Sequence, residues 1–268
     1  MPEQSTEPSP FEGRVAVVTG ASEGIGAAVV AGLARGGATV AFCARGEERA
    51  QQLAATLAGA PGAVHAYSAD MGDADSTTTF LDAVAGDIGA VDIVINNVGA
   101  SPSRNFLYMA DEDWDQLFQL NLMSAVRCTR RFLPGMRKQR WGRVVMMSTA
   151  AAKYPNAATI DYAASKAAMV AMAKALARKY GQDNVLVNSV LPGLIRTSMW
   201  ERTASEIAEA GGTGVEDVFV ARSKPVPLGR YGTPEEVANL VLFLCSEGAS
   251  YLTGAAIEVD GGWSAGVY

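Results

Sequence analysis

The feature that most constrains how this chain folds is a short apolar run that passes directly into a glycine-rich segment. Residues Arg14–Thr19 (RVAVVT) have the β-branched composition of a buried strand, and Thr19–Gly26 (TGASEGIG) follow without a linker. The alanine- and valine-rich segment Gly26–Arg35 comes next and predicts a helix, which Gly36-Gly37 terminates. A strand, a sharp turn and a helix in this order predict the start of a βαβ arrangement.

The same alternation continues to the end of the chain. Further strands are predicted at Thr39–Ala44, Ala63–Ser68, Val91–Asn96, Arg143–Ser148, Val185–Val190 and Ile257–Asp260. Helices are predicted at Glu47–Leu57, Thr77–Ala85, Asp111–Phe132 and Tyr162–Tyr180, and from Thr233-Pro234 onward. The sequence therefore predicts an α/β fold: a Rossmann-like, doubly wound parallel sheet of about seven strands with helices on both faces, in three α/β/α layers.

No repeat, charge block or proline-serine linker divides the body of the chain, so residues 13–268 are expected to form one domain. Residues 1–12, with their acids, prolines and serines, are expected to be a disordered tail. The least regular part, Ser198–Lys224, contains three glycines and is expected to be a mobile substrate lid. Its apolar residues either contact an apolar or acyl-bearing substrate or pack the lid onto the body; they are Met199, Trp200, Ile207, Val215, Val218 and Phe219.

Composition argues against several classes of partner. A formal net charge of -6 over 268 residues repels phosphate backbones, so nucleic acid is not expected. No stretch approaches the roughly 20 apolar residues of a membrane helix, and the N-terminus lacks the pattern of a secretory signal. Cys43, Cys128 and Cys245 have no disulfide, redox or metal-ligand spacing, so they are expected to be core residues and no metal is expected. We expect a soluble, cytoplasmic protein.

The glycine-rich segment stands where a pyrophosphate would bind. Its glycines let the backbone approach an anion without Cβ collisions, and the helix that begins there offers unpaired N–H groups and the positive end of its dipole. The residues of this expected dinucleotide loop are Gly20, Ser22, Glu23, Gly24, Ile25 and Gly26.

The ends of the next three strands supply further candidates for the cofactor site. A carboxylate at the end of the second strand would repel a 2′-phosphate, but this chain has Ala44 followed by Arg45, whose guanidinium can bind that phosphate. NADP(H) is therefore favoured, and NAD(H) remains possible if Arg45 is only a solvated loop residue. Asp70, Asn97 and Gly99 follow the third and fourth strands at the same sheet edge, although Asp, Asn and Gly are also common turn formers.

A catalytic pair is predicted one helical turn apart. Tyr162 and Lys166 share one face of a helix, and the lysine ammonium is expected to lower the pKa of the phenol and so make Tyr162 an acid or base near neutral pH. Ser148, which ends the preceding strand, can donate to a substrate oxygen. A Ser-His hydrolase is not expected, because the only histidine, His65, lies in an apolar strand and is expected to be a packed core residue.

In this order the motifs resemble the single-domain branch of the short-chain dehydrogenase/reductase family, from Arg14 to Gly262. The matching pieces are Thr19–Gly26, Ala69–Met71 (ADM), Asn96–Gly99 (NNVG), Asn121 within LNL, Ser148, Tyr162–Lys166 (YAASK), Leu191–Thr197 (LPGLIRT) and VDGGW near the end. Within the family the chain is most similar to bacterial ketoreductases of the 3-oxoacyl carrier-protein type. Such proteins are commonly homotetramers that pair their last strands and long helices, so a homotetramer or a homodimer is expected.

The resemblance also implies roles for individual residues. Asn121 would complete a tetrad with Ser148, Tyr162 and Lys166, and would hold a water that links the lysine to solvent. A segment after the sixth strand would lie over the nicotinamide, and Met71 would join the cofactor site. The residues of that segment expected to contact the cofactor are Pro192, Gly193, Ile195 and Thr197.

Two departures from the family pattern stand out. Val98 replaces the usual alanine, and the interval from Ser148 to Tyr162 is one residue longer than is common. The longer loop, at Lys153–Pro155, is expected to reshape the substrate pocket.

The leading hypothesis is an NADPH-dependent oxidoreductase that reduces a ketone, such as a 3-oxoacyl thioester, to a secondary alcohol with Tyr162 as proton donor. An NAD-linked alcohol, sugar or steroid dehydrogenase on the same fold is the alternative. A non-catalytic dinucleotide sensor or scaffold is a third possibility, but such a protein would not need the tetrad.

Overall fold

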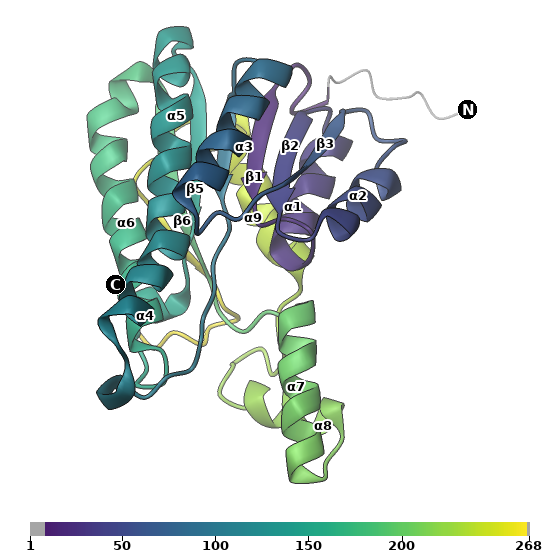
Figure 1. The fold of residues 1–268 in the computed structure, drawn as a ribbon, viewed down its shortest axis with the longest axis vertical. Helices are drawn as coiled ribbons and strands as arrows, with labels where there is room; N and C mark the ends of the chain where they lie inside the picture. The colour runs from purple at the N-terminus through teal and green to yellow at the C-terminus, as the bar shows by residue number, and fades with distance from the viewer. Residues whose placement is uncertain (1–8, 267–268) are drawn as a thin grey trace.

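The computed structural model describes residues 9–266 and shows one sheet of seven parallel strands (Figure 1). In space the strands run β3-β2-β1-β4-β5-β6-β7. Their bounds are β1 (Val15–Thr19), β2 (Thr39–Ala44), β3 (Val64–Ser68), β4 (Ile93–Asn96), β5 (Gly142–Met147), β6 (Val185–Pro192) and β7 (Ala256–Val259). The predicted doubly wound α/β fold is confirmed, and every predicted strand is present with ends shifted by at most two residues.

Helices cover both faces of the sheet and form the predicted outer layers. One face packs against α1 (Gly24–Arg35), α2 (Glu47–Thr56) and α9 (Pro234–Cys245), and the other against α3 (Ala74–Asp87), α5 (Ser124–Gln139) and α6 (Ile160–Tyr180). Successive strand side chains point to opposite faces, so Val17 packs into one core while Ala16 and Val18 pack into the other. Burial on both faces explains why these strands read as continuous apolar runs.

The helix predicted at Asp111–Phe132 is longer and less regular than expected. It begins as α4 (Asp111–Phe118), passes through a π-helical turn, η2 (Gln119–Met123), and continues as α5 to Gln139. The chain stays helical through Pro134, which lies on the exposed side of α5. A π turn keeps the chain helical while changing which face a side chain occupies, so apolar periodicity does not reveal it.

The expectation of an irregular lid at Ser198–Lys224 is wrong. The segment forms two helices, α7 (Ser198–Gly211) and α8 (Val215–Ser223), which project from the body as a separate lobe (Figure 1). Its glycines make the turn between the helices, where Gly212 has a φ of 63°. The lobe has its own small core, so the packing interpretation holds for most of its apolar residues; those in or against that core are Trp200, Ile207, Val215, Val218 and Phe219.

Met199 is different, because it is 49% exposed and lines the cavities described below. Whether the lobe moves as a lid stays a prediction.

Two expectations near the sheet margin are also wrong. His65 is exposed and not a core residue, because β3 is the outermost strand and its histidine faces solvent. Of the predicted tail, residues 1–8 lie outside the described part, but Phe11 is 4% exposed, packs into the core and donates its backbone N–H to the carbonyl of Gly36 at 2.9 Å.

No helix within residues 9–266 combines the length and apolar character of a membrane span. In the same part of the chain, no three His, Cys, Asp or Glu side chains are grouped as metal ligands would be.

Candidate active site

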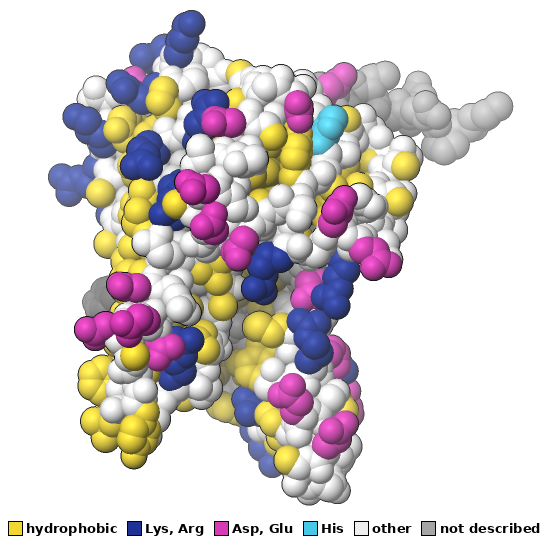
Figure 2. Space-filling view, viewed as in Figure 1, with side chains coloured by type: hydrophobic (Ala, Val, Ile, Leu, Met, Phe, Trp, Pro, Cys, Tyr) yellow, Lys and Arg dark blue, Asp and Glu magenta, His cyan; other side chains and the backbone are white. Residues whose placement is uncertain are grey.

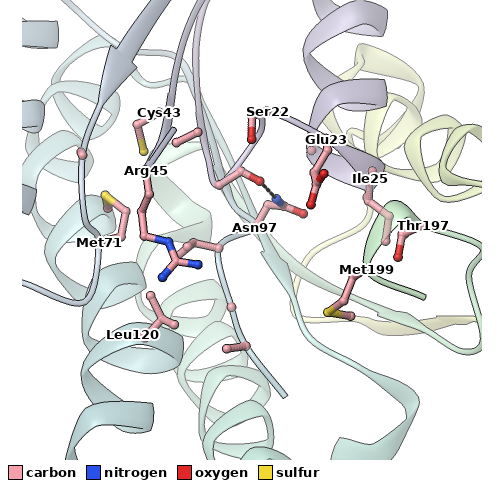
Figure 3. A pocket seen from close by; sticks show the side chains of 18 of the residues that line it. Ser22, Glu23, Ile25, Cys43, Arg45, Met71, Asn97, Leu120, Thr197 and Met199 are labelled. Atoms are coloured by element: carbon pink, nitrogen blue, oxygen red, sulfur yellow. Dashed lines mark hydrogen bonds between the residues drawn. The ribbon is translucent and has the colours of Figure 1, made fainter. Parts of the chain in front are cut away.

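The candidate site lies at the carboxyl end of the sheet, where the strand order reverses between β1 and β4. Loops that follow these neighbouring strands leave in opposite directions, and doubly wound sheets bind ligands in the crevice between them. A cavity of about 310 Å³ is found there (Figure 3). It is lined by every residue predicted for the cofactor in the loops after the first four strands: Gly20, Ser22, Glu23, Gly24, Ile25, Gly26, Arg45, Asp70, Met71, Asn97 and Gly99.

Two positions of the glycine loop have no room for a larger residue. Gly20 has a φ of +65°, and a Cβ there would lie 2.8 Å from the Cα of Val98. A Cβ on Gly26 would lie 2.7 Å from the Cα of Ala21 and 2.8 Å from the carbonyl oxygen of Gly20. This tight loop places the start of α1 at the cavity, and its N-cap residue, Glu23, makes no side-chain capping bond to the free N–H groups. Such a loop fits a pyrophosphate.

Asn97 holds the loop together. Its Nδ2 donates to the carbonyl oxygen of Gly20 at 2.8 Å (Figure 3). It also donates from Nδ2 to the carbonyl oxygen of Thr19 at 3.0 Å, and its backbone N–H donates to Oγ1 of Thr19 at 3.1 Å. The residue therefore ties the end of β4 to the end of β1. That it also contacts a cofactor stays a prediction.

Arg45 is the available cation of this cavity. It follows β2 directly and extends its guanidinium into the cavity (Figure 3). Within residues 9–266 it forms no ion pair and no side-chain hydrogen bond, so its charge is open to a ligand. Glu23, by contrast, is ion-paired with Arg202 at 2.9 Å and with Arg49 at 3.5 Å.

A second cavity, of about 200 Å³, continues from the first. The two share lining residues, including Ile25, Gly99 and Thr197. The second is lined by the remaining predicted residues except Asn121; they are Ser148, Tyr162, Lys166, Pro192, Gly193, Ile195 and Thr197. The structure thus brings the nucleotide loop and the predicted catalytic groups to one continuous hollow.

Lys166 and Ser148 are held from α6 and the end of β5. Lys166 is 3% exposed, and its Nζ donates to the carbonyl oxygen of Met147 at 2.8 Å. Burial lowers the pKa of Lys166 to about 8. The hydroxyl of Ser148 donates to the backbone carbonyl of Lys166 at 3.0 Å, which fixes the serine beside the helix.

The expectation that Lys166 lowers the pKa of Tyr162 is wrong for this structure. Enclosure of the ring raises the pKa of Tyr162 above its ordinary value, and a hydrogen bond with Thr149 opposes that rise only in part. The Lys166 ammonium is bonded to Met147 and is not among the causes of the shift. The physical reason is that loss of hydration outweighs hydrogen bonding to the phenolate.

Asn121 lies in the π turn η2 and is fully buried. Its Nδ2 donates to the carbonyl of Ala100 and to Oγ of Ser165, both at 3.0 Å, and its Oδ1 accepts from the N–H of Ala100 at 2.9 Å. Gly99 lies close to both Asn121 and Lys166. A Cβ built on Gly99 would be 2.9 Å from the lysine Nζ and 3.2 Å from the Asn121 Oδ1. The residue links the loop after β4 to α6, and its predicted water-holding role is a proposal.

Comparison with known proteins agrees with this geometry. A family model described as "Enoyl-(Acyl carrier protein) reductase" matches residues 20–264. The chain belongs to the short-chain dehydrogenase/reductase family. It is therefore an oxidoreductase by family.

Curated members of this family resemble the chain over nearly their full length. The 3-oxoacyl-[acyl-carrier-protein] reductase of Aquifex aeolicus is 36% identical over 253 residues, which cover 94% of this chain and 98% of the relative. That of Thermotoga maritima is 37% identical over 252 residues, with the same coverage. Among solved structures, L-sorbose reductase from Gluconobacter frateurii, complexed with NADPH and L-sorbose, superposes with a TM-score of 0.94 at 33% identity and covers 97% of this chain and 100% of that chain.

This short-chain dehydrogenase/reductase also has cavity residues that the motifs did not predict. Among them are Thr149, Ser101 and Leu120, which line the hollow. Thr149 follows β5, Ser101 follows β4 and Leu120 directly precedes Asn121. These positions beside predicted site residues could have identified them.

Lys153–Pro155 of the longer loop after Ser148 do not line either cavity, contrary to expectation. Instead, Lys153 pairs with Glu258 of β7 at 2.6 Å and donates to the carbonyl of Ala256, so the loop is held against the edge strand.

Proposed function

We propose that this protein uses NADPH to reduce a ketone, a 3-oxoacyl thioester or a similar carbonyl compound, to a secondary alcohol. The observation that carries the proposal is the continuity of the two cavities. Ser148 and Tyr162 line a hollow that opens past Gly99 and Thr197 to the nucleotide loop. A carbonyl compound bound in the second cavity would lie beside these hydroxyl donors and next to a cofactor bound in the first cavity. NADPH, when bound, supplies the hydride.

Three observations support NADP(H) over NAD(H). The last residue of β2 is Ala44, so no carboxylate stands there to repel a 2′-phosphate. Arg45 presents an unpaired guanidinium to the same cavity in the described part of the chain. The similar L-sorbose reductase was solved with NADPH.

Tyr162 is the proposed proton donor. Because enclosure raises the pKa of Tyr162, its hydroxyl keeps the proton at neutral pH and is ready to act as an acid toward a carbonyl oxygen. Lys166, with a pKa of about 8, is mostly protonated at pH 7 and would return a proton to Tyr162, with Asn121 holding the connecting water. Ser148 would orient the carbonyl by a hydrogen bond.

A substrate panel tests this proposal. Oxidation of NADPH and of NADH would be followed at 340 nm, about the absorbance maximum of the reduced nicotinamide, with acetoacetyl thioesters, diketones, ketose sugars, steroids, quinones and an enoyl thioester. We expect turnover of at least one ketone, with kcat/KM for NADPH well above that for NADH. Turnover of the enoyl thioester alone would reject ketone reduction, and no turnover at all would reject the catalytic proposal.

A sugar ketone is the second candidate substrate. It is favoured by the TM-score of 0.94 to a structure holding L-sorbose and by the hydroxyl groups of Ser101 and Thr149 on the cavity wall. Met199 and Trp200 on the same wall favour an apolar acyl chain. Separate ketose and thioester arms of the panel decide between them.

We also propose that the protein works in the cytoplasm as a homotetramer or homodimer. A groove of about 290 Å³ between α5 and α6 supports self-association, because its lining includes Val126, Leu133, Met172 and Leu176. Light scattering coupled to gel filtration should give a mass two or four times that of the 28.0 kDa chain. A monomer at micromolar concentration would contradict this.

A further inference from the structure

The glycine loop carries a carboxylate at a position where it would hinder the proposed cofactor. Glu23 is the N-cap of α1 and lines the same cavity as Arg45. A free carboxylate there would repel a phosphate group bound by Arg45, because like charges in one partly enclosed cavity destabilise each other. The loop therefore needs a means of neutralising Glu23 if the cofactor carries a 2′-phosphate.

Two arginines from separate elements supply that neutralisation. Arg202 of α7 places Nη2 at 2.9 Å from Oε1 and Nη1 at 3.5 Å from Oε2 of Glu23. Arg49 of α2 places Nη1 at 3.5 Å from Oε2. The hydrogen bond from Arg202 is the main reason why the pKa of Glu23 is below its usual range, so the carboxylate is ionised and paired at neutral pH.

The same contact fixes the lobe. Among the ion pairs of residues 9–266, the Glu23–Arg202 pair alone joins α7 or α8 to an element before β6. Figure 2 shows Lys and Arg side chains gathered where the lobe meets the body, with acidic side chains among them. The small core of the lobe also includes Leu194 and Tyr231, from the segments that connect the lobe to the body.

We propose that Arg202 determines cofactor specificity by neutralising Glu23, which leaves the charge of Arg45 free to bind the 2′-phosphate of NADP(H). This inference rests on the proposed use of NADP(H). It gives Arg202 an indirect part: the guanidinium acts on Glu23 and is not itself the phosphate ligand. The specificity of the nucleotide loop is then shared between residues that lie 179 positions apart in the sequence.

The experiment is a double-variant cycle read out by cofactor binding, followed through the fluorescence of bound NADPH and NADH. In Arg202→Met, Glu23 is left with only the longer Arg49 contact, and the Kd for NADPH should rise about tenfold while that for NADH changes less than about threefold. In Glu23→Gln/Arg202→Met, no carboxylate needs neutralising, and the NADPH Kd should return to within about threefold of the wild-type value.

The other outcomes overturn the proposal in distinct ways. If the double variant binds NADPH as poorly as Arg202→Met, Arg202 contacts the phosphate directly. If NADPH and NADH lose affinity equally, the pair acts on a group that both cofactors share or on the position of the lobe, and not on the 2′-phosphate. Unchanged NADPH affinity in Arg202→Met means that the pairing has no part in specificity.

Controls separate this proposal from folding defects and from the proposed function. Arg222→Met removes the same charge from an exposed site on α8 where the arginine lies over Trp200 and not beside Glu23, and it should leave both Kd values unchanged. Thermal unfolding of each variant checks that it folds. A wild-type protein that prefers NADH would reject NADP(H) use itself, whatever the variants do.

Discussion

The proposed nucleotide half of the site and its proposed catalytic half are built in different ways. The nucleotide half takes its shape from backbone: Gly20 and Gly26 have neighbours so close that only glycine fits. The catalytic half depends on buried side chains, Lys166 and Asn121, whose partners come from several elements. A sequence motif can therefore locate both halves, whereas the charge state of the proposed catalytic half depends on packing between distant segments.

The largest expected effect on stability concerns the buried charge of Lys166. In the unfolded chain Lys166 has the ordinary pKa of 10.5, and in the folded protein the pKa is about 8. Below pH 8 both states are protonated, and the cost of the buried charge is fully present. Between pH 8 and 10.5 only the folded state releases the proton, so wild-type stability rises with pH over that range.

Replacing the lysine should remove this dependence. We expect Lys166→Met to gain up to about 3 kcal/mol over wild type below pH 8, less the lost bond to Met147, and to lose that advantage by pH 10.5. Urea unfolding of both proteins at pH 7, 9 and 10.5 measures it. A stability difference that does not change with pH would show that Lys166 is not desolvated as described.

The second prediction concerns the backbone of the glycine loop in the nucleotide half. In Gly26→Ala the new Cβ would meet backbone atoms of Ala21 and Gly20 within 2.8 Å, which the loop cannot relieve by a rotamer change. We expect the Kd for NADPH to rise about 100-fold, or about 2.7 kcal/mol, measured by titration calorimetry.

The matched control for that substitution is Gly86→Ala in α3, where a Cβ meets nothing within 4 Å. It should leave NADPH binding intact and stabilise the helix by about 0.5–1 kcal/mol. Similar NADPH affinities in the two variants would contradict the backbone account.

The smallest effect is expected where the loop after β5 meets β7. Lys153→Met removes a part-buried ion pair to Glu258 and should cost about 1 kcal/mol in urea unfolding, while kcat/KM changes less than about twofold because Lys153 does not line the cavities. Glu258→Gln should lose a similar amount, and the double variant no more than either alone. A tenfold change in kcat/KM in Lys153→Met would instead support the prediction from the sequence that Lys153–Pro155 shape the substrate pocket.

The parts of the fold that followed from sequence are those with local causes. Parallel strands that are buried on both faces have apolar sequences, so each can be recognised by itself. The motif TGASEGIG indicates a tight loop, because close contacts at Gly20 and Gly26 leave room only for glycine. Tyr162 and Lys166 share a helix face by spacing alone. These features need no knowledge of which segments meet in space.

The features that were missed have non-local causes. His65 is exposed because β3 is the outermost strand, and the position of a strand in the sheet cannot be inferred from the sequence of that strand alone. The glycines near Gly212 suggested irregular chain, although they make one turn between two helices. The raised pKa of Tyr162 follows from the segments that enclose its ring, so the Tyr-Lys spacing alone predicted the wrong direction.

Tyr162 is proposed to donate the proton in an NADPH-dependent reduction of a ketone. This proton transfer is tested most directly by comparing wild type with Tyr162→Phe on the best ketone of the substrate panel, with NADPH binding measured on the same samples. We expect kcat to fall by about 10³-fold or more while the Kd for NADPH stays within about twofold. A Tyr162→Phe variant that retains kcat within about tenfold of wild type, with NADPH bound equally well, would contradict the assignment of Tyr162 as proton donor.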